Sequence, residues 1–414
     1  MTRVIHTGDT HLGYRQYHRP ERREDFLDAF RTVAEDAVAE DADAVVHAGD
    51  LFHDRRPTLP DIMGALSVLR TLEDAGIPFL AVVGNHESKR DAQWLDLFES
   101  LGLATRLGGE PVAVGNTAFY GLDFVPRANR ADLDYEFEPH DGEHAALVSH
   151  GLFEPFPHGD WDAREVLAES PVAFDAVLLG DDHTHRRKRV ETPHEAWLTY
   201  SGSTERASAD ERDQRGYNLV VFEEGVDIRR RGLDTREFVF VDVELGPGEG
   251  VERVRERVGQ HDLAGAVVVV SIDGEGEPVT PAAIEEFADE RGALVARVTD
   301  HRELADESDV EVSFADPDEA VHERVRDLGL SPAARDIDET VRASKVVDSK
   351  VADTIEERVA EIVAEADPGA FDSAPDREDT ATEDGANGEA VPDEAETAGG
   401  DHDGDGQVTM EDYL

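Results

Sequence analysis

The chain of 414 residues contains no cysteine. This excludes disulfide bonds, zinc sites built from thiolates and a cysteine nucleophile. No apolar run approaches the roughly 18 residues that a membrane-spanning helix requires, and the first residues lack the apolar segment of a secretion signal. We therefore expect a soluble protein of the cell interior.

Lysine is also scarce. The sequence has 40 lysines and arginines against 95 aspartates and glutamates, a formal net charge of −55, and only Lys89, Lys188, Lys345 and Lys350 are lysines. In ordinary buffer such a charge destabilises a compact state, but at molar salt the Debye length falls to about 3 Å and the repulsion is screened. The composition resembles that of proteins from halophiles that accumulate salt. The alternative is an acidic protein that binds basic partners.

Short apolar runs alternate with amphipathic stretches up to residue 235. Buried strands are expected at residues 4–5, 44–46, 79–83, 146–148 and 176–179. Between the first two, apolar residues recur at helical spacing. This alternation indicates a layered α/β domain, which we place at residues 1–235.

Three further parts are expected after residue 235. Residues 236–315 alternate strand and helix patterns and predict a small α+β domain. Residues 316–366 show the three- and four-residue apolar spacing of helices. Residues 367–414 combine proline, glycine, alanine, threonine and acidic residues with almost no large apolar side chains, which predicts a disordered acidic tail.

Side chains that can bind metal ions follow five of the predicted strands. They are Asp9, His11, Asp50, Asn85, His150, His183 and His185. Ligand groups converge at the carboxyl ends of strands in open α/β sheets, so segments that are distant in sequence can meet at one point. A single Asp-x-His or His-x-His occurs by chance, but five motifs in order, each after an apolar strand, indicate a metal site.

The ligand types point to two ions. Oxygen and nitrogen ligands without sulfur suit manganese, iron or zinc rather than calcium. Seven candidate ligands are too many for one first-row ion, but they fit two ions about 3.5–4 Å apart that share one carboxylate. Such a pair clamps the attacking and leaving oxygens of a phosphoryl displacement.

These motifs resemble those of the calcineurin-like metallophosphoesterase superfamily. Gly-Asp-Thr-His-Leu-Gly-Tyr at residues 8–14, Gly-Asp-Leu-Phe-His at residues 49–53 and the order of the domains are most similar to the nuclease subunit of the double-strand-break repair complex, the "meiotic recombination eleven" family, in an archaeal and halophilic form. The resemblance implies an α/β fold with a β-sandwich flanked by helices, followed by a small α+β domain that caps DNA and by C-terminal helices.

The resemblance also implies roles for single residues. One manganese ion would be held by Asp9, His11, Asp50 and His185, and a second by Asp50, Asn85, His150 and His183, so that Asp50 bridges the two. His86 resembles the family's catalytic histidine, which protonates the leaving 3′ oxygen. His53 resembles a histidine that steadies the charged transition state, and the alternative for it is a loop histidine that caps a helix.

The sequence departs from the family pattern in two motifs. Asp181 and Asp182 precede His183, where Gly-His-x-His is usual, and Glu87 stands where aspartate is commoner. The acidic pair either orients the imidazoles or belongs to the general acidity of the chain. Neither departure removes a ligand.

Basic residues gather directly downstream of the metal motifs. We expect a basic rim that binds DNA, formed by Arg15, Arg19, Arg22, Arg23, Arg55, Arg56, Arg90, Arg187 and Arg189. Contacts from such residues to phosphate dominate affinity for DNA. The alternative is a set of arginines that pair with neighbouring acidic residues on a solvated face.

No Gly-x4-Gly-Lys-[Ser/Thr] motif is present, so any ATP-driven step must come from another chain. In the family that chain is a coiled-coil ABC-type ATPase, and residues 331–365 are our candidate for the segment that binds it. The alternative is a helix docked on its own domain. The family also forms homodimers through helices after the second and third motifs. Core packing is an equally good explanation for half of the residues that would form this seam, which are Ile62, Leu66, Trp94, Phe98 and Leu101.

The resemblance thus predicts a manganese-dependent DNA nuclease of the cytoplasm, associated with the nucleoid, that acts in double-strand break repair. It implies 3′-to-5′ exonuclease activity on duplex ends and endonuclease activity on single strands. Two rivals stay open: a generic dimetal phosphatase or phosphodiesterase with the same seven ligands, and a non-catalytic scaffold that tethers DNA ends.

Overall fold

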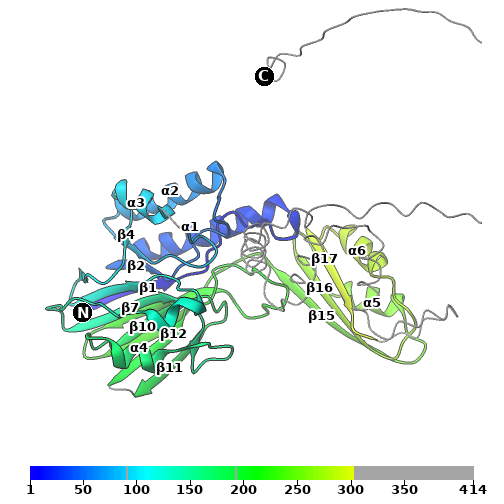
Figure 1. Cartoon of the computed structure of the whole chain (residues 1–414). Helices are drawn as coiled ribbons and strands as arrows, with labels where there is room; N and C mark the ends of the chain where they lie inside the picture. Colours follow the sequence, from blue (N-terminus) through cyan, green and yellow to red (C-terminus); the bar gives the residue numbers. More distant parts are fainter. Residues whose placement is uncertain (90–91, 192–193, 303–414) are drawn as a thin grey trace, which may run out of the picture. The chain divides into compact units, whose positions relative to one another are not determined.

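The computed structural model describes residues 1–89, 92–191 and 194–302 (Figure 1). Arg90, the predicted helices at residues 316–366, the segment at 331–365 and the acidic tail at 367–414 lie outside the described residues. Among the helices described, none has the length and apolarity needed to cross a membrane.

Two six-stranded sheets make up the first part of the chain. The first sheet has the order β14-β13-β1-β2-β3-β4, with bounds Val226–Gly232, Gly216–Phe222, Thr2–Thr7, Ala44–His47, Phe79–Ala81 and Thr105–Arg106. The second has the order β11-β12-β10-β7-β6-β5, with bounds Arg186–Glu191, Glu195–Tyr200, Ala176–Gly180, His144–His150, Thr117–Leu122 and Val112–Val114. Strands β1, β2 and β3 are parallel neighbours, as are β7 and β10.

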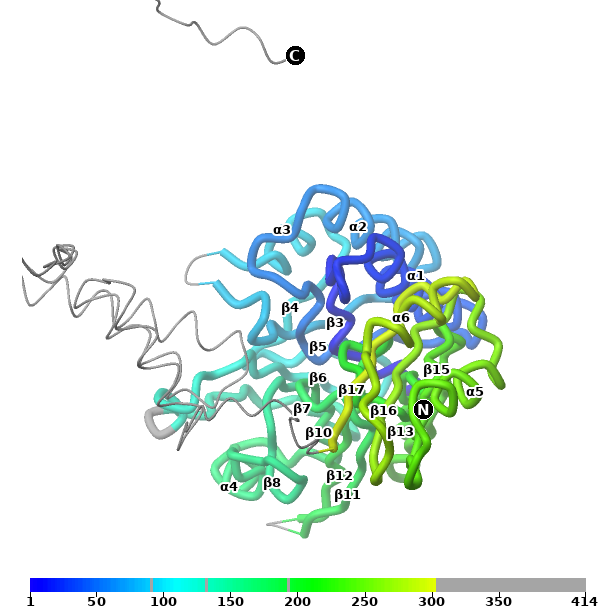
Figure 2. Tube along the Cα trace, turned by 90° about the vertical axis from the view of Figure 1, so that its right-hand side faces the viewer, coloured from blue at the N-terminus to red at the C-terminus, as the bar shows by residue number. Residues whose placement is uncertain are grey.

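The strands are apolar on both faces because both faces are covered. Val4 and Val46 of the first sheet point into the core between the two sheets, where Val148 of the second sheet also lies. Their neighbours Ile5 and Val45 point the other way, into a core with the helices. Successive side chains of a strand alternate between faces, and a strand that is buried on both sides therefore has a continuous apolar run. Figure 2 shows β3 and β4 on one side of this sandwich and β7 and β10 on the other.

Helices cover the outer faces of the sandwich. Helices α1 (Pro20–Ala39), α2 (Leu59–Asp74) and α3 (Trp94–Ser100) pack on the first sheet, where Figure 1 shows them together. Helix α4 (Ala163–Glu169) packs on the second sheet. The remaining short elements are η1, η2, β8 and β9, at Gln16–His18, Arg127–Asp132, Phe153–Glu154 and Trp161–Asp162. The predicted β-sandwich with flanking helices is confirmed.

A second, smaller sheet follows. Strands β15 (Phe238–Leu245), β16 (Val267–Gly274) and β17 (Val295–Asp300) are parallel neighbours. Helices α5 (Val251–Val258) and α6 (Pro281–Asp289) connect them and share one apolar core with the sheet. Figure 1 shows both helices on the same face, as right-handed crossovers in one direction require.

Arg22, near the start of α1, is fully buried. Its guanidinium donates to Gln16 Oε1 at 2.9 Å, to Asp25 Oδ2 at 2.6 Å and to the Arg206 carbonyl oxygen at 2.9 Å. The Glu205 carboxylate lies 3.3 Å away. The prediction that Arg22 contacts DNA is therefore wrong, because its donors are turned inward to the protein. This arginine holds the start of α1 to the loop that precedes β13.

We expect Arg22→Met to lower the free energy of unfolding by about 3 kcal/mol or more, because it leaves buried carboxylates without their partner. The measurement is urea unfolding at constant molar KCl. The matched control is Arg31→Met on the same helix. Its exposed side chain pairs with Asp28 three residues earlier, and such pairs contribute less than about 1 kcal/mol. Equal losses in the two variants would contradict this assignment.

Candidate metal centre

The predicted ligands lie at the carboxyl ends of five strands. Asp9 follows β1 closely, Asp50 follows β2, Asn85 follows β3, His150 ends β7, and His183 follows β10. The turns are tied together by their backbones: Asp9 N donates to the Gly49 carbonyl oxygen at 3.0 Å, and His11 N to the Asp50 carbonyl oxygen at 3.0 Å. The ends of both sheets thus converge on one point, as the order of the motifs predicted.

Two groups of ligand atoms meet at this point and share Asp9. One consists of Asp9, His11 and His183, and the other of Asp9, Asp50 and His150, with all ligand atoms of a group within 4.8 Å of one another. Nε2 of His11 lies 3.1 Å from Nε2 of His183. Two imidazole nitrogens that face each other at this distance, beside two buried carboxylates, form a donor set that fits a divalent cation.

The second group also contains Asn85. Its Oδ1 lies 2.9 Å from Nε2 of His150, and Oδ2 of Asp50 lies 3.5 Å from the same nitrogen. Six of the seven predicted ligands are brought together by these distances. The structure places His183 beside His11 and Asp9, whereas the resemblance allots it to the ion of Asn85 and His150. The allotment of ligands to two ions remains a prediction.

Hydrogen bonds fix which nitrogen of three histidines can face a metal. Nδ1 of His150 lies 2.8 Å from the Ala48 carbonyl oxygen, and Nδ1 of His185 lies 3.1 Å from that of Tyr200. A carbonyl oxygen only accepts, so each Nδ1 carries a proton, and in the neutral imidazole that binds metal each Nε2 has the lone pair. Nδ1 of His183 donates to Glu211 Oε1 at 2.8 Å in the same way. These bonds orient the imidazoles as metal-binding histidines require.

Glu211 is a partner of the site that was not predicted from the sequence. This residue lies in the loop before β13, 28 positions after His183, and no local motif marks it. Its other oxygen pairs with Arg215 at 2.9 Å. Burial lowers the pKa of His183, but the Glu211 carboxylate, with Asp9 and Asp181, outweighs burial and raises this pKa to about 9. Metal binding at His183 must therefore displace a proton.

The backbone of the site is strained at three of its ligands. Asp9, His11 and Asp50 have φ angles of 51°, 44° and 57°. Residues other than glycine seldom adopt this left-handed backbone region. Such strain persists only where the surrounding structure holds it, and it concentrates at functional sites. Gly84 allows the Asp50 carboxylate to lie close to its backbone, because a Cβ there would lie 2.1 Å from Asp50 Oδ1. The glycine of the Gly-Asn-His motif is thus required by the neighbouring carboxylate.

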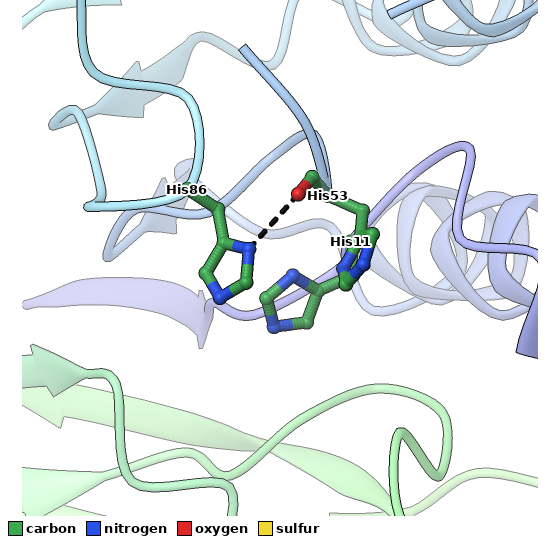
Figure 3. Close-up of side chains that lie close together, drawn as sticks. All are labelled: His11, His53 and His86. Atoms are coloured by element: carbon green, nitrogen blue, oxygen red, sulfur yellow. Dashed lines mark hydrogen bonds between the residues drawn. The ribbon is translucent and has the colours of Figure 1, made fainter. Parts of the chain in front are cut away.

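The two predicted catalytic histidines lie beside the ligands. Figure 3 shows His86 and His53 next to His11, with Nδ1 of His86 bonded to the His53 carbonyl oxygen at 2.9 Å. The His86 backbone N–H donates to Asp50 Oδ1 at 2.9 Å. The imidazole of His53 stacks on Tyr14, with ring centroids 3.9 Å apart. Burial, and then the charge of His86, lowers the pKa of His53 to about 4, so this side chain is neutral at pH 7.

Glu87 ties the second motif to the third. Its buried carboxylate accepts the backbone N–H groups of Leu51 at 3.2 Å, Phe52 at 3.1 Å and Gly84 at 3.4 Å. Burial, and then repulsion from Asp50, raises the pKa of Glu87 to about 8. The departure from aspartate noted in the sequence therefore supplies an acceptor that reaches two turns at once.

The predicted basic rim is only partly exposed. Arg15, Arg19, Arg55, Arg56, Arg187 and Arg189 are exposed. Arg23 instead pairs with Asp61 at 2.7 Å, within the cap of α2. Arg189 pairs with Glu195 and stacks over Trp197 at 4.4 Å. Acidic residues thus pair with Arg23 and Arg189, as they do with the buried Arg22, which is what the alternative expected. For the other exposed arginines the predicted role stays a hypothesis.

Comparisons with known proteins agree with this geometry. Residues 2–186 match the model of the calcineurin-like phosphoesterase family. The chain is 63% identical, over 92% of its length and 87% of the relative, to the DNA double-strand break repair protein Mre11 of Haloferax volcanii. It is 58% identical to the protein of the same name from Halobacterium salinarum, over 90% of this chain and 97% of that one. A third protein of this name, from Methanosarcina acetivorans, is 44% identical over 87% of this chain and 61% of its own length.

We expect Glu211→Gln to weaken binding of Mn²⁺ about tenfold and Glu211→Ala up to about 100-fold, because the partner that orients a metal-binding histidine contributes this much to affinity. Calorimetric titration of the metal-free chain measures the effect. The control is Glu224→Gln, an exposed acid in the turn between β13 and β14. Wild-type affinity in Glu211→Ala would exclude a role for this residue at the metal centre.

Proposed function

The chain belongs to the Mre11 family of DNA double-strand break repair proteins, and on this premise we propose that it is a manganese-dependent DNA nuclease. The observation that carries the proposal is the convergence of Asp9, His11, Asp50, His150 and His183 at the ends of both sheets. The proposed activities are 3′-to-5′ exonuclease action on duplex ends and endonuclease action on single strands.

The metal centre is proposed to hold two Mn²⁺ ions. Asp9, His11, Asp50 and His185 bind one, and Asp50, Asn85, His150 and His183 bind the other. When bound, the ions polarise the phosphodiester and activate the attacking water. The buried site supports this chemistry, because hydrogen bonds at Nδ1 leave the Nε2 lone pairs of His150, His183 and His185 for metal.

His86 is proposed to deliver a proton to the leaving 3′ oxygen. Its Nδ1 is held by the His53 carbonyl oxygen, so Nε2 is the nitrogen that remains for proton transfer. The stacked ring of His53 lies 5.0 Å from that of His86. An imidazole nitrogen can carry and deliver a proton. The His53 carbonyl oxygen keeps the imidazole of His86 in its orientation, and the His53 side chain is proposed to steady the charged transition state.

DNA is proposed to approach along the exposed arginines of the rim. Arg15 and Arg19 flank η1, and Arg56 lies three residues beyond His53. Contacts of this kind attract phosphate without reading sequence. Because salt weakens them, a protein in molar salt depends more strongly on the metal centre itself to hold the scissile phosphate.

The division into parts is also a proposal. Residues 1–235 form the nuclease domain, 236–315 the domain that caps DNA, and 316–366 the segment that binds a coiled-coil ABC-type ATPase through 331–365. The acidic tail follows at 367–414. The acidic composition fits a cytoplasm that accumulates salt, in which the protein works at the nucleoid.

A homodimer is proposed through α2 and α3. Leu59, Met63, Leu97 and Leu101 are exposed large apolar side chains on or next to these helices. Phe98, by contrast, is fully buried, and Ile62, Leu66 and Trp94 pack against the core. Of the residues first predicted for the dimer interface, Leu101 is thus the exposed one. The exposed side chains support an interface on the outer face of these helices, away from the core.

We expect the purified chain to digest end-labelled duplex DNA at molar KCl only when Mn²⁺ is added. His86→Asn should lower cleavage about 100-fold or more, the usual contribution of a general acid, while binding of Mn²⁺ is retained. The exposed His18→Asn serves as the control. Cleavage of small phosphodiesters alone would favour the generic phosphodiesterase, and full activity of His86→Asn would refute the proposed proton donor.

The triple variant Arg15→Ser, Arg19→Ser, Arg56→Ser should weaken DNA binding and reduce the slope of log K against log salt by about 0.9 for each lost phosphate contact. Hydrolysis of a small phosphodiester should be unchanged, because the metal centre is intact. Arg31→Ser with Arg229→Ser, which removes two exposed arginines that pair with acids, is the control. An unchanged DNA affinity and salt slope would rule out the rim.

A further inference from the structure

Asp181 occupies a backbone conformation that favours glycine. It is the first residue after β10, and its φ angle is 94°. Glycine adopts this conformation without a penalty from Cβ, whereas other residues are strained there. The backbone N–H donates to both oxygens of Asp9, at 3.0 and 3.1 Å, and glycine would make the same bonds. Glycine would be less strained at this position, so the aspartate is a reason to expect a function for its side chain.

The carboxylate of Asp181 lies at the second group of ligands. Its Oδ1 is 3.8 Å from Nε2 of His150. The same nitrogen lies 2.9 Å from Asn85 Oδ1 and 3.5 Å from Asp50 Oδ2. With metal–ligand bonds of about 2.1 Å, two ligands of one octahedral ion are about 3.0 Å apart when adjacent and about 4.2 Å apart when opposite. All three oxygens thus lie at separations from His150 that one ion can span.

The carboxylate of Asp181 is more exposed than the ligands that it approaches. The side chain of Asp181 is 26% exposed, whereas those of His150 and Asp50 are at most 2% exposed. The carboxylate therefore approaches the group from its solvent-facing side.

The neighbouring Asp182 has a different role. Its Oδ1 accepts the Thr184 backbone N–H at 2.9 Å, and its Oδ2 pairs with Arg186 at 2.5 Å. These bonds shape the turn that presents His183. Of the two acids that precede the His-x-His motif, Asp181 lies 3.8 Å from His150, whereas Asp182 pairs with Arg186. The two acids therefore have different surroundings and are not uniform surface acidity.

We propose that Asp181 is an additional oxygen ligand of the ion bound by Asn85 and His150. The inference rests on the proposed two-metal site and extends its ligand set from seven residues to eight. Apart from the shared Asp50, the other ligands allotted to this ion are an amide and two imidazoles, which are neutral when they bind metal. A second carboxylate supplies the negative charge that a hard divalent cation prefers, and the strained backbone at Asp181 is retained for this reason.

The test is calorimetric titration of Mn²⁺ into the metal-free full chain at molar KCl, with electron paramagnetic resonance of the spin-coupled ion pair as a second measurement. Wild type should bind two ions. Asp181→Gly should bind one ion with wild-type affinity and the other at least about tenfold more weakly, and Asp181→Asn should lie between, because its amide oxygen can still bind. Glu224→Gln, the loss of one charge from an exposed acid in the turn between β13 and β14, should bind both ions as wild type does.

Asp181→Gly also tests folding separately from metal binding. Without metal, its melting temperature should equal or exceed that of wild type, because glycine relieves the positive φ. Unchanged binding of both ions in Asp181→Gly, or an equal loss in Glu224→Gln, would overturn the inference and leave the proposed function intact. A wild-type chain that binds fewer than two ions would instead overturn the two-metal function itself.

Discussion

The site depends on one contact between the two sheets, the hydrogen bond from His150 to the carbonyl oxygen of Ala48. His150 ends a strand of the second sheet, and Ala48 follows a strand of the first. The sheets come so close here that a Cβ on Gly180 would lie 2.1 Å from the same carbonyl oxygen. This contact fixes the tautomer of His150 and sets the distance between two groups of ligands. The arrangement of the candidate ligands depends on this close approach of the two sheets.

The sequence alone predicted a layered α/β domain and the convergence of most candidate ligands, for a physical reason, whereas the β-sandwich was implied by the family resemblance. A strand buried on both faces has a continuous apolar run, so the ends of β1, β2, β3, β7 and β10 were visible together with the polar residues that follow them. What was not visible depends on contacts between distant segments. Arg22 is buried by a loop more than 180 positions later, and Glu211 reaches His183 from a polar loop without a motif. Local patterns hold no information about either contact.

The acidity of the chain has two components that the structure separates. Some carboxylates on or near the surface pair with arginines, as Asp28 does with Arg31 and Glu195 with Arg189. Others, such as Asp9, Asp50 and Glu87, are buried around the metal centre. Salt screens the interactions of the surface carboxylates. It screens those of the buried carboxylates much less. A net charge of −55 is therefore compatible with a protein that acts on a polyanion.

The bond between the Asp181 backbone and Asp9 joins the first and last motifs over 172 positions. In addition, β1 pairs on one side with β13, which ends at Phe222. A nascent chain on the ribosome therefore cannot complete the ligand set until His185 has emerged. It cannot complete the first sheet, which includes β13 and β14, until more than half of the protein has emerged. Truncated translation products that stop before β13 lack the strand that pairs with β1 on one side, and they therefore cannot form the complete first sheet.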